Sequence, residues 1–204
     1  MGDQVPIIHR TSWSRIDKEA TSILDVLQPR ALSGEEAVSI DSIFEFDLPD
    51  IMLERYGISL RTGVTDLSKY GHGEILLGIT DAKAGLCLID KSVYETTDPV
   101  QLRRGRATMA HEMYHCLCHV PRARTFTSKS NSSFVNAFPR CQKNQLKAYE
   151  DPEKQAWKFA QMLMMPKPAI LKFLQEGRSE QWMADFFDVN PAFLRARLGC
   201  NSLK

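Results

Sequence analysis

The sequence lacks the features that would place it in several special classes of protein. It contains no apolar run approaching the roughly 20 residues of a membrane-spanning helix. Residues 1–10 contain no apolar stretch of the kind that marks a secretory signal. The 26 basic and 25 acidic side chains leave a net charge of +1, so the chain has no bulk polyanion-binding character. We therefore expect a cytoplasmic protein without membrane association.

Cysteine is also scarce, with five residues at uneven spacings. Without an export signal, reduced thiols are expected instead of disulfides. A structural zinc site of Cys116, Cys118, His119 and Cys141 is an alternative. However, Cys116 and Cys118 would point about 200° apart on a helix, and a C-x-x-C knuckle is absent. We interpret both thiols as packing residues.

Length and composition are those of a folded domain. The 204 residues are 43% hydrophobic and 25% charged, which is ordinary for a globular protein. We expect one main domain over residues 1–166 and a C-terminal helical extension, resembling a helix-turn-helix, over residues 167–204. The spacing of apolar residues predicts helices over 13–27 and within 43–56.

Strands are predicted between these helices and the centre of the chain. Residues 58–61 alternate in polarity, whereas 75–80 and 86–89 are apolar runs joined by a hairpin-like loop. Such a sheet has edge strands that can pair with an extended peptide, although the sequence does not indicate which strand is the edge.

The chemistry of the chain centres on His111-Glu112-Met113-Tyr114-His115. Asp98 and Pro99 are suited to begin a helix here, and Pro121 is expected to end it. On that helix His111 and His115 lie one turn apart and can share one cation. Glu112 lies about 100° around the helix, beside the metal, within reach of a water. This H-E-x-x-H pattern is the metalloprotease signature; the alternative is a pair of core histidines.

A third ligand is expected on a second helix, predicted between Pro152 and Pro166. Glu153 begins a stripe of small apolar residues on that helix. A carboxylate there is costly to bury alone, and a metal would satisfy it. The alternative is a first-turn glutamate that the helix dipole favours. Glu150 and Asp151 are the fallback ligands.

Residues 106–119 and 153–166 resemble two segments of the ImmA/IrrE metallopeptidases. The first is similar to the active-site helix, and His119, eight residues after His111, fits its pattern. The second is similar to the family stretch E-x-x-A-x-x-F-A-x-x-L-L-M-P. Tyr114 stands where family members commonly carry glycine, and Met164 stands where they carry leucine.

The resemblance implies a catalytic Zn²⁺, or Mn²⁺, on His111, His115 and Glu153, with Glu112 as general base. It implies an α+β, zincin-like fold, in which a small, mostly antiparallel sheet packs on the H-E-x-x-H helix between N-terminal and C-terminal helices. It also implies a zinc-dependent endopeptidase that cleaves a helix-turn-helix transcriptional repressor and so derepresses genes.

Two alternatives from other functional classes stay open. One is a catalytically silent zincin scaffold that binds or sequesters a repressor. The other is a DNA-binding regulator that uses Arg195 and Arg197 of the C-terminal helices. Phe193, Leu194 and Leu198 indicate burial of those helices instead, and the basic residues are few. We therefore do not expect direct binding to nucleic acid.

A long connection, residues 120–148, separates the two ligand helices. It is polar and basic, and connections of this length are usually functional or disordered. We interpret it as a flap over the active site, the alternative being a solvated insertion without a role.

Overall fold

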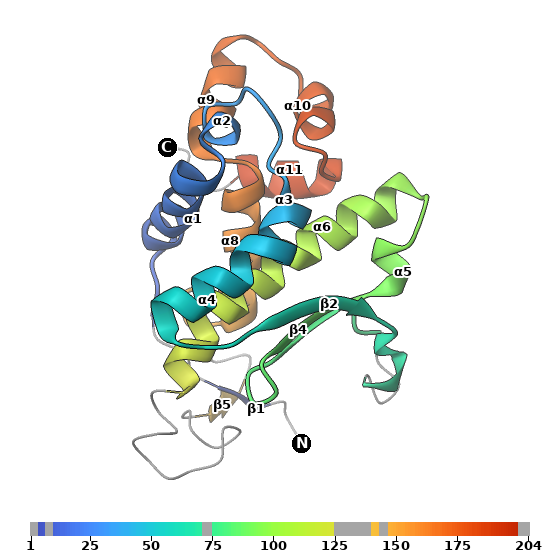
Figure 1. Ribbon diagram of the computed structural model, residues 1–204. Coiled ribbons are helices and arrows are strands. Elements are labelled where there is room, and N and C mark those ends of the chain that lie inside the picture. Colours follow the sequence, from blue (N-terminus) through green and yellow to red (C-terminus); the bar gives the residue numbers. More distant parts are fainter. Residues whose placement is uncertain (1–3, 7–9, 71–74, 125–139, 143–146, 200–204) are drawn as a thin grey trace.

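Three packed helices form the centre of the protein. The computed structural model describes residues 4–6, 10–70, 75–124, 140–142 and 147–199. Helix α6 (Pro99–Tyr114) packs against α8 (Pro152–Met164), and α8 also packs against α1 (Trp13–Leu27). Figure 1 shows the small sheet on one side of α6 and the C-terminal helices at the opposite end of the molecule.

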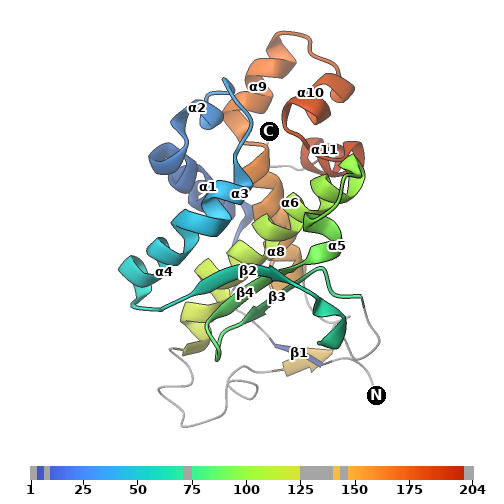
Figure 2. The ribbon, with the colours of Figure 1, turned by 45° about the vertical axis from the view of Figure 1, so that its right-hand side comes forward.

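The sheet has three strands, β2 (Arg61–Thr65), β3 (Gly78–Asp81) and β4 (Leu86–Asp90). Strand β4 is central and pairs in parallel with β2 and antiparallel with β3. The predicted hairpin is thus present as β3–β4. In the described part of the chain, no strand pairs with the outer side of β3, which lies beside α6 (Figure 2).

An almost continuous helical segment precedes the sheet. It consists of α3 (Ile40–Ser42), a π-helical turn (Ile43–Asp47) and α4 (Leu48–Tyr56). Gly57 ends it in the left-handed conformation, at a φ of 63°, where glycine has no Cβ to strain. Short helical elements, α2 (Pro29–Leu32), a 3-10 turn (Leu67–Lys69) and α5 (Lys91–Tyr94), complete this half.

Helix α6 begins as its sequence predicts, but helical structure continues past the expected end at Pro121. The Asp98 carboxylate caps it by accepting from the Val100 N–H. A π-helical turn, His115–His119, follows, and helical structure continues through residues 120–124. The prediction that Pro121 ends the helix was therefore wrong. A π turn already departs from the regular α-helical bonding pattern, so a proline two residues after it is easier to accommodate.

The C-terminal region forms α9 (Lys167–Gln175), α10 (Glu180–Phe186) and α11 (Pro191–Leu198). Arg197 is fully buried, donates from Nε to the Met165 carbonyl at 3.1 Å, and pairs with Asp17 of α1 at 3.3 Å. Asp188 pairs with both Arg103 and Arg106 of α6. The tail is thus packed against the helical core, whereas the domain boundary at residue 166 stays a prediction.

A two-stranded ribbon joins distant parts of the chain. Strand β1 (Gln4–Pro6) pairs antiparallel with β5 (Arg140–Gln142). Strand β5 belongs to the 120–148 connection, for which no strand was predicted. Residues 125–139 and 143–146 lie outside the described residues, so the flap interpretation is untested.

The predicted α+β, zincin-like fold class is confirmed, with a sheet that is mixed because β2 runs parallel to β4. Within the described residues, no helix is both long and apolar enough to cross a membrane.

Candidate metal centre

The three predicted ligands converge. His111 of α6, His115 of the π turn and Glu153 in the first turn of α8 each offer an atom within 4.8 Å of the others. The Nε2 atoms of the two histidines are 3.0 Å apart. Glu153 Oε2 is 3.1 Å from His111 Nε2, and its Oε1 is 3.4 Å from His115 Nε2. The fold thus places Glu153 next to His115, which precedes it by 38 positions in the chain.

These donors fit a metal ion in both spacing and chemistry. At metal–ligand distances of about 2.0–2.1 Å, a tetrahedral site places its donor atoms about 3.3–3.4 Å apart. The separations in the cluster are close to that value. Two imidazole nitrogens and a carboxylate around one point form an electron-rich centre that suits a divalent cation. The residues therefore form a candidate metal site, with a further coordination position left for water.

A chain of buried side chains sets the tautomer of His115. Gln155 Nε2 donates to the Tyr149 carbonyl at 2.7 Å, so its Oε1 is left to accept from His119 Nε2, 3.4 Å away. His119 Nδ1 then carries a lone pair and accepts from His115 Nδ1 at 2.8 Å. His115 consequently presents its Nε2 lone pair to the cluster, as metal-binding histidines do.

Glu112 points to the sheet side of the cluster. It is 7% exposed, and its Oε2 accepts from the Thr80 hydroxyl of β3 at 2.7 Å. Gly78 gives the carboxylate its space, because a Cβ there would lie 2.7 Å from Glu112 Cγ and 2.9 Å from its Oε1. Strand β3 therefore holds the carboxylate beside the cluster.

Burial and neighbouring charges have opposite effects on the pKa values of Glu153 and His115. Burial would raise the pKa of Glu153, but the hydrogen bonds and charges of His111 and His115 hold that pKa well below its usual range. Burial would lower the pKa of His115, but Glu153 raises it. Burial lowers the pKa of His119, which keeps that ring neutral. A neutral His119 is what the hydrogen-bond chain requires.

The alternative ligands are occupied elsewhere. Glu150 pairs with Arg10 at 2.7 Å, and the buried Asp151 caps α8 by accepting from the N–H groups of Glu153 and Lys154. Among the described residues, the grouping able to hold a metal is His111, His115 and Glu153. The side chain of Cys141 lies outside the described residues, so the cysteine site is not tested in full.

Sequence reasoning missed three neighbours of the cluster. Thr80 and Gln155 reach Glu112 and His119 from other elements. The Trp157 ring lies 4.4 Å from that of His111. The position of Trp157 four residues after Glu153 was a usable signal, since residues four apart share a helix face. Nothing in the sequence pairs Thr80 with Glu112.

Comparison with solved structures supports the fold. No curated protein matches the chain. A solved structure described as a "Mycobacterium tuberculosis transcriptional regulator" is similar, with a TM-score of 0.52 and 14% sequence identity. The match covers 91% of this chain and 46% of that one, so this chain spans about half the length of that structure. At this identity the likeness shows the fold alone.

The α+β fold with a cluster of two histidines and a glutamate is the arrangement of a zincin-like metallopeptidase. Residues 100–199 match the model of the Peptidase M78 family, the IrrE N-terminal-like domain. The predicted resemblance to this family is thus confirmed over residues 100–199.

Proposed function

We propose that the protein is a zinc-dependent endopeptidase. The observation that carries the proposal is the convergence of His111, His115 and Glu153 around one point, with Glu112 held beside it. The family match supports a metallopeptidase-type hydrolase. Zinc is the metal that a site of two histidines and one glutamate commonly binds for hydrolysis, and Mn²⁺ is the alternative.

Each residue of the proposed active site has a separate role in hydrolysis. His111, His115 and Glu153 would hold the zinc, which when bound polarises the scissile carbonyl and acidifies a water. Glu112 accepts the proton of the attacking water and delivers it to the leaving amine nitrogen as the C–N bond breaks. The Thr80 hydroxyl keeps one carboxylate oxygen of Glu112 occupied and fixes the direction of the other.

Strand β3 offers a place for the substrate backbone. It is an edge strand within the described part of the chain, and Gly78 and Thr80 on it contact Glu112. A peptide that adds to this edge as a further strand would lie next to the general base. Main-chain hydrogen bonds would then bind many sequences, and side-chain contacts would set specificity.

The proposed substrate is a helix-turn-helix transcriptional repressor, cleaved in the cytoplasm so that its genes are expressed. The family resemblance supports this substrate, and the similar solved structure is described as a transcriptional regulator. A catalytically silent scaffold that sequesters the same repressor is the second candidate. The third candidate, DNA reading by α11, is disfavoured because Arg197 is buried in an ion pair with Asp17.

Substituting Glu112 by glutamine separates the first two candidates. Candidate repressors would be incubated with zinc-loaded wild type, Glu112→Gln and the control Glu95→Gln, which alters an exposed glutamate. Mass spectrometry would identify new termini, and a pull-down would report binding. Wild type and the control should cleave, whereas Glu112→Gln should bind substrate and zinc without cleaving. Cleavage by Glu112→Gln at the wild-type rate would refute the proposal. Binding without cleavage by all three proteins would favour the scaffold.

A further inference from the structure

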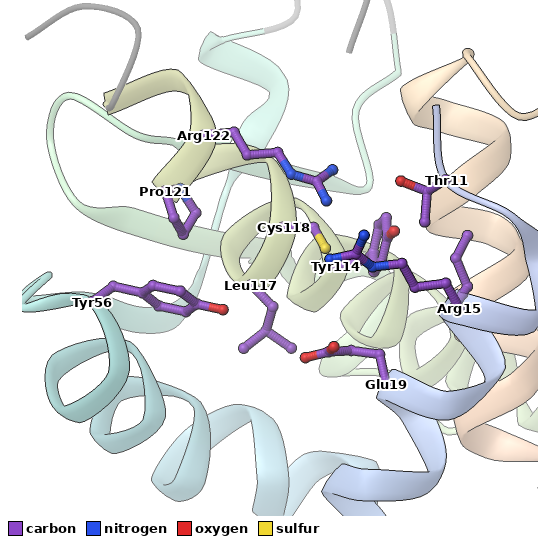
Figure 3. A pocket seen from close by; sticks show the side chains of 10 residues that line it. Thr11, Arg15, Glu19, Tyr56, Tyr114, Leu117, Cys118, Pro121 and Arg122 are labelled. Carbon is purple, nitrogen blue, oxygen red and sulfur yellow. The ribbon is translucent and has the colours of Figure 1, made fainter. Parts of the chain in front are cut away.

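A cavity separate from the metal cluster lies against the helical segment that carries His115. Its volume is about 220 Å³, and Figure 3 shows its lining side chains. None of the three candidate metal ligands lines it. It is lined by Thr11, Arg15, Ile16, Glu19, Tyr56, Tyr114, Leu117, Cys118, Pro121 and Arg122. Cys118, interpreted from the sequence as a packing residue, is part of this lining.

Two cationic side chains of the cavity have no anionic partner among the described residues. Arg15 and Arg122 form no ion pair there, and a terminal nitrogen of Arg122 is buried without a hydrogen-bond partner. The nearby Glu19 pairs with Arg55, at 3.6 Å. Residues 123–149, which follow Arg122 in the sequence, contain no aspartate or glutamate.

The hydroxyl of Tyr114 is a third polar group on the wall of the cavity. The side chain is 1% exposed, and the Cys118 thiol and the Thr11 hydroxyl are the polar groups next to its hydroxyl. Burial and the neighbouring Cys118 raise the pKa of Tyr114, so the hydroxyl keeps its proton and can donate it to a ligand. Figure 3 shows the guanidinium groups of Arg15 and Arg122 directed toward the same part of the cavity, next to Tyr114 and Cys118.

We propose that this cavity binds a small oxyanion, a carboxylate or phosphate group, between Arg15 and Arg122. Guanidinium groups donate planar pairs of hydrogen bonds to such oxygens, and the Tyr114 hydroxyl donates a further one. The cavity is smaller than the roughly 300–1,000 Å³ of sites for drug-sized ligands. The ligand is thus a small metabolite or the charged end of a larger molecule.

The test measures anion binding by isothermal titration calorimetry. The probes are inorganic phosphate and acetate, each compared with chloride at equal ionic strength. The proteins are wild type, the double variant Arg15→Gln/Arg122→Gln, Tyr114→Phe, and the control Arg104→Gln, which removes an exposed arginine elsewhere on α6. Glu153→Ala is included because phosphate can also bind a metal ion.

Wild type, Arg104→Gln and Glu153→Ala should bind the anion probe at one site with equal affinity. The double variant should bind at least about tenfold more weakly, since hydrogen bonds to charged groups contribute effects of this size. Tyr114→Phe should weaken anion binding, because it removes one hydrogen-bond donor from the cavity wall. A response to phosphate alone identifies a phosphate ligand, and a response to acetate identifies a carboxylate. Absence of saturable binding, or equal affinity in the double variant, would overturn the proposal.

Discussion

The Nδ1 atoms of His115 and His119 lie 2.8 Å apart, with both residues on one π-helical turn. One of the two nitrogens must donate and the other must accept. Gln155 determines that His115 donates and His119 accepts, because the carboxamide oxygen of Gln155 faces His119 Nε2. His119 therefore orients a candidate metal ligand without belonging to the cluster.

Replacing His119 by phenylalanine should weaken zinc binding. The ring would still fill the buried space, but His115 would lose the acceptor that fixes its tautomer. Removing a hydrogen-bond partner of a metal-binding histidine costs about 10–100-fold in metal affinity. Competition with a chromophoric chelator measures the dissociation constant, and circular dichroism checks the fold. Wild-type zinc affinity in a folded His119→Phe would show that the contact has no positioning role.

Thr80→Val should lower peptidase activity and leave metal content unchanged. The substitution preserves the shape of the side chain and removes the hydroxyl that donates to Glu112 at 2.7 Å. We expect a loss of about tenfold in kcat, corresponding to one hydrogen bond to a charged group. Thr80→Ser is the matched control because it keeps the hydroxyl. Equal rates for Thr80→Val and Thr80→Ser would argue against the role given to this hydroxyl.

Gly105→Ala should destabilise the protein although it lies within a helix. Helix propensity alone favours alanine by about 1 kcal/mol. However, a Cβ at Gly105 would lie 2.3 Å from the Val93 carbonyl oxygen, which is backbone and cannot rotate away. We expect a loss of up to about 3 kcal/mol in the free energy of unfolding, as for overpacked sites.

Denaturant unfolding measures this loss, with Gly63→Ala as the control. At that position the nearest atom to a new Cβ is in the Leu88 side chain, at 3.7 Å. A more stable Gly105→Ala protein would contradict the close packing of α5 on α6.

Arg197→Met should also destabilise the protein, because it removes one partner of a buried ion pair and leaves Asp17 and the Met165 carbonyl without their donor. The expected loss in the free energy of unfolding is about 3 kcal/mol. Arg195→Met alters an exposed residue of the same helix and serves as the control. If both variants are equally stable, Arg197 does not anchor the tail.

The sequence predicted the helices well because their signals are local. Residues 13–27 have helical spacing and become α1, and Asp98 caps α6 as expected. Strands were displaced by up to four residues: residues 58–61 were expected and β2 spans Arg61–Thr65. Strand boundaries depend on pairing with β4, a contact that the local pattern does not encode.

The candidate ligands were predictable for a similar reason. His111 and His115 share a helical face, and Glu153 begins a recognisable second helix. The supporting contacts were not predictable, because Thr80 and Glu112 are 32 residues apart and meet only through the tertiary fold. The π turn was missed as well, since nothing in residues 115–119 distinguishes it from an α-helix by spacing.

The most direct test of the metal centre is the zinc content of the purified protein beside that of Glu153→Ala. Inductively coupled plasma mass spectrometry after dialysis against trace zinc gives metal per chain, and circular dichroism confirms that both proteins are folded. We predict about one zinc per chain in the wild type, and a loss or strong weakening in the variant. A wild-type protein that takes up no zinc, or a Glu153→Ala variant that holds it equally tightly, would contradict the proposed site.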